Sequence, residues 1–177
     1  TTHIGVGTRP LFLFVSQSNF PDKQLKNQAI DSLGMDARID RTVAEKFPGL
    51  KIGFIKLSGV SVGPTSASVN EFIAKILEKA RKIHSKEIKW AKEYRSLYWA
   101  YEIDPTKYKP SGEALIKRLL AGKELYEVNN VVNVANSISI LSGFSVVIYD
   151  AKKILEPITV RTARAGELLL AIGTKGE

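Results

Sequence analysis

The chain has no cysteine, two histidines and a single methionine among its 177 residues. The absence of cysteine excludes disulfide bridges, thiolate catalysis and cysteine-bound metals. His3 and His84 leave little for a zinc or iron centre, so we expect no cofactor, although a carboxylate-bound magnesium stays open. No apolar run approaches the roughly 20 residues of a membrane span, and the run at residues 11–15 lacks a following cleavage pattern. We therefore expect a cytoplasmic protein with no membrane partner.

The length and the apolar content, 44% of the residues, are enough for one sizeable core. The net charge of +8 is unevenly placed, since residues 75–95 carry eight basic side chains against three acidic ones. Five of the lysines are spaced four, three, four and three residues apart, which on a helix makes one continuous stripe: Lys75, Lys79, Lys82, Lys86 and Lys89. With Arg95, this stripe could follow an RNA phosphate backbone, or it could be the solvated face of an amphipathic helix. Charge alone leaves both interpretations open.

The hydrophobic pattern predicts a mixture of helices and strands. Ser68 and Glu71 form a capping box that opens the clearest helix, which we expect to break near Ser85 and to resume from Trp90 to Trp99. Further helices are predicted from Pro21 to Gly34, over residues 40–47, from Ser111 to Gly122 and over residues 129–143, where the β-branched content also allows a strand. Strands are predicted at residues 11–15, 50–57, 60–62, 144–149, 158–163 and 167–172, the last two joined as a hairpin by residues 164–166.

Polar and aromatic side chains that a fold does not require are concentrated in residues 94–150. Four asparagines stand there among valines and isoleucines: Asn129, Asn130, Asn133 and Asn136. An asparagine side chain carries both a donor and an acceptor on a short stem, and a solvated surface would use lysine and glutamate instead. The series therefore indicates a lined polar pocket.

Four short segments carry a resemblance to a known family: YKPSGEAL at 108–115, VVNVAN at 131–136, IYD at 148–150 and VRTARAGE at 160–167. Over residues 40–173 the chain resembles the B3/B4 domain, the tRNA-binding and editing domain of the phenylalanyl-tRNA synthetase β subunit, and more closely its free-standing relatives. The resemblance implies an α+β fold, a three-layer arrangement of two small β-sheets with helices, with a pocket between them. We expect residues 35–177 to form this domain and residues 1–34 to be an N-terminal extension packed on it.

In the synthetase this pocket hydrolyses tRNA wrongly charged with tyrosine. Asn136 matches an asparagine that lines the family's pocket, and Glu167 ends the family's Arg-x-x-Arg-x-Gly-Glu pattern. Asn133 stands where the synthetase form usually has aspartate, and Val147 near where bacterial synthetases carry a histidine, so the amino acid recognised is open. The chain lacks a synthetase catalytic module and would act in trans.

Hydrolysis of an aminoacyl ester needs a positioned water, donors to the developing oxyanion and an anchor for the α-ammonium group. Asn133 and Asn136 could anchor and stabilise, while Glu113 or Glu167 could orient the water or bind the ammonium. Structural roles compete with these assignments. We expect Ser111 to be the N-cap of a helix, and the helix dipole favours a carboxylate such as Glu113 in its first turn. Glu167 could pair with Arg161 or Arg164. We expect His84 to be exposed, and Tyr98 and Trp99 to lie in the core.

Three functions follow from these observations. The first is an editing-type domain that binds aminoacyl-tRNA and hydrolyses the wrong amino acid from it, as an aminoacyl-tRNA deacylase. The second is a non-catalytic module that binds tRNA or another RNA through the same lysine stripe. The third is a pocket for a small amino-acid-like metabolite. Neither the substrate nor the oligomeric state follows from the sequence.

Overall fold

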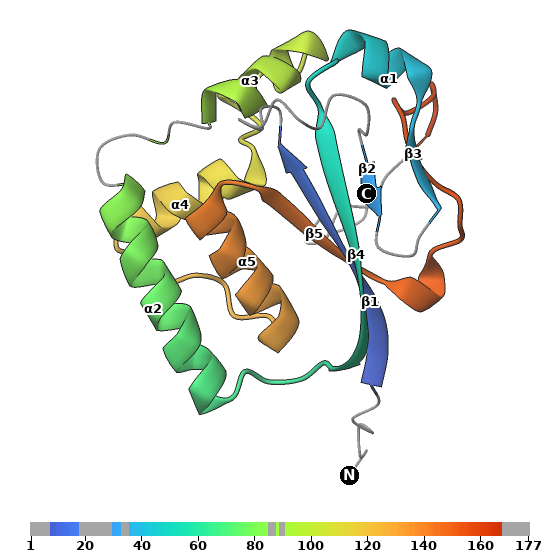
Figure 1. Ribbon diagram of the computed structural model, residues 1–177. Helices are drawn as coiled ribbons and strands as arrows, with labels where there is room; N and C mark the ends of the chain where they lie inside the picture. The colour runs from blue at the N-terminus through green and yellow to red at the C-terminus, as the bar shows by residue number, and fades with distance from the viewer. Residues whose placement is uncertain (1–7, 18–29, 33–35, 85–87, 89–90, 168–177) are drawn as a thin grey trace.

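The computed structural model describes residues 8–17, 30–32, 36–84, 88 and 91–167 (Figure 1). Its elements are β1 (Thr8–Gln17), β2 (Ile30–Ser32), β3 (Ala37–Ile39), α1 (Arg41–Lys46), β4 (Lys51–Ser61), α2 (Ala67–His84), α3 (Ala91–Ala100), α4 (Ser111–Leu120), α5 (Asn130–Ser142), β5 (Ser145–Asp150), the 3-10 turn η1 (Ala151–Lys153) and β6 (Ile158–Val160). Within these residues no helix is long and apolar enough to cross a membrane.

The main sheet has four strands in the order β2-β4-β1-β5. β1 pairs antiparallel with both neighbours, with Phe14 opposite Phe54 of β4 and Val147 of β5, and β2 joins β4 in parallel. β1 therefore lies inside the sheet, although it belongs to the predicted N-terminal extension. The division of the chain at residue 34 remains a prediction. β3 and β6 form a separate parallel pair, which brings residues 37–39 beside residues 158–160.

Two hydrophobic clusters lie in the described part of the chain, one between the two sheets and one among the helices. Ile52 and Phe54 alternate along β4, so both point to one face of the main sheet, and there they pack against residues of β3, β6 and η1 such as Ile39 and Ile158. A second cluster unites α2, α4 and α5 through four buried residues: Ala80, Ile116, Leu119 and Ile140. The predicted α+β fold of two small sheets with helices is confirmed (Figure 1).

Helix ends follow the capping residues that the sequence supplies. Asp40 accepts a hydrogen bond from the Thr42 amide at 2.9 Å and begins α1, and Asn129 begins α5 by accepting one from the Val132 amide at 2.9 Å. α5 ends at Gly143, whose φ of 78° is a left-handed conformation that glycine adopts without steric cost. Capping thus confirms the predicted helices at residues 40–47 and 129–143.

Several local predictions are wrong. Residues 30–32 form β2 and are not helical, and the two strands predicted between residues 50 and 62 are one strand, β4. α2 begins before the predicted capping box, because the hydroxyl of Ser66, not that of Ser68, accepts from the Val69 amide at 3.4 Å. The helix predicted over residues 21–29 and the hairpin strand over 168–172 lie outside the described residues.

Three side-chain predictions are also wrong. The N-cap of α4 is Pro110, and Ser111 is the first helical residue, since proline is well suited to precede a helix. His84 is buried with 6% of its surface exposed, because it ends the inward face of α2 that contains Ile76 and Ala80. Trp99 lies on the outer face of α3 with 57% of its surface exposed, so it is not part of the core.

Candidate functional site: a pocket beside a basic helix

The asparagines at the start of α5 hold the loop between β4 and α2. Asn130 accepts a hydrogen bond from the Gly63 amide at 3.0 Å and donates one to the Ser61 carbonyl at 2.9 Å. The backbone amide of Asn130 also donates to the Gly63 carbonyl at 2.9 Å. This asparagine therefore fastens two segments that are 69 residues apart in the sequence.

Asn133 has a similar structural role one turn further along α5. Its amide nitrogen donates to the Thr65 hydroxyl at 2.8 Å, and its oxygen accepts from the Val128 amide at 3.0 Å. Both ends of the side chain are thus occupied, since it ties the β4–α2 loop to the segment before α5. A group in this state is a poor candidate for stabilising a reaction intermediate.

A pocket of about 310 Å³ lies between α2, α5 and the segment that joins α4 to α5; we call it the α2–α5 pocket. Nine residues line it: Asn70, Ile73, Leu77, Glu124, Leu125, Tyr126, Glu127, Asn133 and Asn136. The side chain of Asn136 makes no hydrogen bond with the described part of the chain, so its donor and acceptor are both available. The lining contains two carboxylates and no lysine or arginine, which favours a cationic group.

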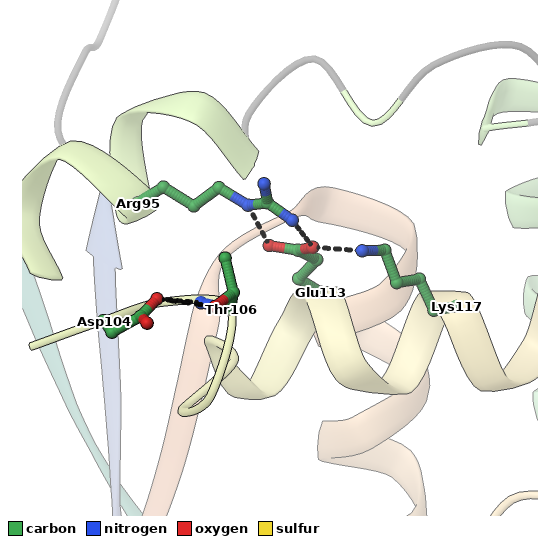
Figure 2. Close-up of polar contacts among 5 residues, drawn as sticks. All are labelled: Arg95, Asp104, Thr106, Glu113 and Lys117. Atoms are coloured by element: carbon green, nitrogen blue, oxygen red, sulfur yellow. Dashed lines mark hydrogen bonds and ion pairs between the residues drawn. The ribbon is translucent and has the colours of Figure 1, made fainter.

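Glu113 stands apart from this pocket, in an ion cluster between α3 and α4 (Figure 2). Its side chain is only 1% exposed. Arg95 donates to both carboxylate oxygens, at 2.9 and 2.5 Å, and the Lys117 ammonium lies 2.6 Å from Oε1. A bidentate arginine–carboxylate contact of this kind is among the strongest polar contacts in proteins. The Glu113 cluster, made of these three side chains, therefore fastens α3 to α4.

The Glu113 cluster strongly favours the ionised carboxylate. Hydrogen bonding by Arg95 is the main reason that the pKa of Glu113 falls to about 2, with Lys117 contributing and burial opposing the shift. A carboxylate with so low a pKa is a weak general base near pH 7. Its contacts also leave little capacity for an ammonium or a water, so the geometry supports the structural role of Glu113.

Glu167 is held in the same way at the C-terminal side of β6. The Arg161 guanidinium donates to its two oxygens at 2.7 and 2.6 Å, and the Arg164 amide donates at 2.7 Å. These hydrogen bonds, those of Arg161 first, lower the pKa of Glu167 to about 2. The pairing of Glu167 with Arg161 that the sequence allows is therefore present.

The four predicted catalytic residues do not form one constellation. Asn133 and Asn136 line the α2–α5 pocket, whereas Glu113 and Glu167 are absent from its lining. Val147 lines a different pocket of about 540 Å³, between β5 and β6, whose walls are mostly apolar. The sequence motifs thus mark at least three separate places in the fold.

The predicted RNA-binding residues are also divided. Lys75, Lys79 and Lys82 are exposed on α2, at the predicted spacing of four and three residues. Lys82 forms an exposed ion pair with Glu78 at 2.7 Å. Lys86 and Lys89 lie outside the described residues. The guanidinium of Arg95 is engaged by buried Glu113, so it is not a free phosphate contact.

Sequence reasoning missed three polar residues of the α2–α5 pocket, Asn70, Glu124 and Glu127. A signal was present, because residues 123–128 combine charged side chains with Leu, Tyr and Val directly before the capping Asn129. Asn70, on α2, points toward the same pocket as Ile73 and Leu77, three and seven residues later. In the described part of the chain, no group of three or more His, Asp and Glu side chains is placed to hold a metal ion.

The fold and the pocket define an α+β domain with a polar, acidic pocket beside a basic helix. Residues 93–177, from α3 to the end of the chain, match the family described as the B3/4 domain. The predicted resemblance to this family is confirmed over these residues. The B3/4 family is found in phenylalanyl-tRNA synthetase β chains. No curated protein and no solved structure matches the chain.

Proposed function

We propose that the protein binds aminoacyl-tRNA in trans, as a free-standing editing-type domain. The single observation that carries the proposal is that α2 contributes both to the wall of the α2–α5 pocket and to an exposed basic surface. Its residues Asn70, Ile73 and Leu77 line the α2–α5 pocket, and Lys75, Lys79 and Lys82 are exposed on the same helix. The family's occurrence in phenylalanyl-tRNA synthetase β chains supports tRNA as the partner.

The charges of α2 and of the α2–α5 pocket favour different parts of an aminoacyl-tRNA. Phosphates are attracted to the exposed lysines of α2 and repelled by Glu124 and Glu127 of the pocket. The α-ammonium group of an esterified amino acid is attracted to those carboxylates, while Ile73 and Leu77 offer apolar contact to its side chain. The 3′ end of a charged tRNA carries both kinds of group within a few ångströms.

Hydrolysis is the second part of the proposal. A water molecule adds to the ester carbonyl carbon, the bond from that carbon to the ribose oxygen breaks, and the ribose oxygen takes a proton. The products are a free amino acid and a tRNA with its hydroxyl restored. Asn136 is the residue proposed to donate to the developing oxyanion, because its side-chain amide has unused donors and, unlike that of exposed Asn70, is partly buried.

Binding of RNA without hydrolysis is the second candidate function. It is favoured by a specific observation: Glu113 and Glu167, the two carboxylates expected to orient water, are both in arginine ion pairs with a pKa of about 2. In that case the α2–α5 pocket would hold the aminoacyl group without cleaving it.

Neutralising the exposed lysines of α2 tests the RNA contact. The triple variant Lys75→Gln, Lys79→Gln and Lys82→Gln should bind tRNA more weakly, and the slope of log affinity against log salt should flatten by up to about 0.9 for each phosphate that is no longer neutralised. The matched control removes three exposed lysines elsewhere, at Lys107, Lys109 and Lys152. Equal weakening in both triples would contradict a specific role for α2, and unchanged affinity in both would favour a metabolite pocket.

A deacylation panel separates the two candidate functions. Correctly and incorrectly charged tRNAs are incubated with the protein, beginning with tyrosine on phenylalanine tRNA, and release of the amino acid is followed. Selective release that is lost in Asn136→Ala while tRNA affinity is kept would support hydrolysis. Salt-sensitive tRNA binding with no release of an amino acid from any member of the panel would support RNA binding without hydrolysis.

A further inference from the structure

Glu93, in the first turn of α3, has a buried carboxylate oxygen that lacks a partner. Its Oε2 accepts no hydrogen bond from any described residue, and it has no counterpart within ion-pair distance there. A buried polar atom without a partner costs free energy, and a charged one costs more than a neutral one. Such an atom is therefore a candidate for receiving a donor that comes from outside the chain.

A pocket of about 360 Å³ adjoins Glu93; we call it the α1–α3 pocket. The turn between α1 and β4 and one side of α3 line it with eight residues: Lys46, Phe47, Pro48, Gly49, Leu50, Glu93, Ser96 and Leu97. Most of these side chains are apolar, and Glu93 supplies the one carboxylate. It is separate from the α2–α5 pocket, since the two share no residue.

Lys46, the cation in this lining, is held by other partners. Its Nζ donates to the Ala100 carbonyl at 2.6 Å and lies 4.2 Å from the centre of the Tyr101 ring. A carbonyl and an aromatic face together satisfy an ammonium group. The hydroxyl proton of Ser96 is used as well, in a hydrogen bond of 3.0 Å to the Lys92 carbonyl, which leaves the oxygen of Ser96 able to accept. The pocket thus offers acceptors and apolar walls.

We propose that the α1–α3 pocket binds a primary ammonium group carried on an apolar stem, with Glu93 as its counter-ion. The ammonium pairs with the Glu93 carboxylate, and its stem packs against Phe47, Leu50 and Leu97. Two sources share this chemistry: a free alkyl or aryl amine, and a lysine side chain of another protein. The proposal is independent of RNA binding, because the lysines of α2 and the residues of the α2–α5 pocket take no part in it.

A matched pair of probes tests the proposal on the full chain. The binding of n-butylamine and of its neutral analogue n-butanol is measured by titration calorimetry and by NMR. We expect butylamine to bind at least about tenfold more tightly, because only the amine pairs with the carboxylate. The amide resonances of Gly49 and Leu97 should shift with butylamine. Equal binding of the two probes, or unshifted resonances of Gly49 and Leu97, would overturn the proposal.

Variants give a second test. Glu93→Gln should weaken butylamine binding about tenfold or more, while the control Glu71→Gln, which removes an exposed carboxylate outside both pockets, should leave it unchanged. Unchanged affinity in Glu93→Gln would also overturn the proposal. If Glu93→Gln fails to fold, the comparison of butylamine with butanol on the natural chain still tests the proposal.

A third probe distinguishes the two sources of the amine. Nα-acetyl-lysine N-methylamide presents the lysine ammonium together with the flanking backbone of a protein. Tighter binding of this probe than of butylamine would identify a protein lysine as the ligand, and weaker binding would identify a free amine.

Discussion

The Glu113 cluster and the α2–α5 pocket are both rich in polar side chains, but they differ in how fully those groups are used. In the cluster, Arg95 and Lys117 occupy both oxygens of a carboxylate that is 1% exposed. In the pocket, Asn136 and two glutamates border an open volume of about 310 Å³, and the Asn136 amide has unused donors and an unused acceptor. The cluster is built to hold helices together, and the pocket has capacity for a ligand.

The difference shows that the type of a polar residue does not reveal its role. Asn133 and Asn136 are the same residue, three positions apart on one helix. The side chain of Asn133 is tied to Thr65 and Val128, and that of Asn136 is not tied to any described residue. A hydrogen bond that is already made within the fold contributes to stability, and one that is still available can contribute to binding.

The largest effect on stability is expected from Glu113→Gln. The pKa of Glu113, lowered from its ordinary 4.5 to about 2, corresponds to about 3 kcal/mol of stabilisation in the folded state, since each unit is about 1.4 kcal/mol. Urea unfolding of the variant should show a loss of that order. The control Glu167→Gln breaks a pair of which both members are more than a third exposed, so it should cost only a small part of that loss. Equal losses would remove the distinction between a buried cluster and a surface pair.

The Glu113 cluster also predicts how stability depends on pH. Because the folded pKa of Glu113 lies below the unfolded value, its stabilisation is fully present above about pH 4.5 and is lost as the pH falls toward 2. The natural chain should therefore lose more stability than Glu113→Gln between pH 5 and pH 2. The free energies of unfolding of the two proteins, measured across this range, should converge at its acidic end. Parallel curves would show that Glu113 is not the group responsible.

A smaller difference is expected between two alanine variants of α5. Asn133→Ala removes two hydrogen bonds and should lower the free energy of unfolding by about 1–2 kcal/mol. Asn136→Ala, which breaks no side-chain hydrogen bond with the described residues, should lie within about 0.5 kcal/mol of the natural chain. Thermal unfolding of both measures the contrast. A loss in Asn136→Ala as large as that in Asn133→Ala would mean that Asn136 has a structural role too.

The sequence predicted the helices at residues 40–47 and 129–143 because their signals are local. Asp40, Asn129 and Gly143 act on backbone groups within a few residues, so their effect can be recognised from spacing alone. The pairing of Glu167 with Arg161 is equally local, and it was foreseen as an alternative.

The predictions that were wrong concern residues whose structure depends on contacts distant in the sequence. β2 is a strand because it pairs with β4, about 20 residues later, and residues 30–32 alone do not reveal this. Glu113 is paired with Arg95, 18 residues before it, and Asn133 with Thr65, 68 residues before it. The family match covers residues 93–177, but only the fold separated the residues that fasten this part of the chain from Asn136, whose amide is available.

The proposed function requires that α2 and Asn136 act on one ligand. The direct measurement is the affinity for phenylalanine tRNA with and without an amino acid attached through a non-hydrolysable amide, in the natural chain and in Asn136→Ala. The charged tRNA should bind the natural chain about fivefold more tightly, the equivalent of one hydrogen bond, and this preference should shrink in Asn136→Ala while the salt slope stays the same. Equal affinity for charged and uncharged tRNA in the natural chain, or a preference of unchanged size in Asn136→Ala, would contradict this requirement.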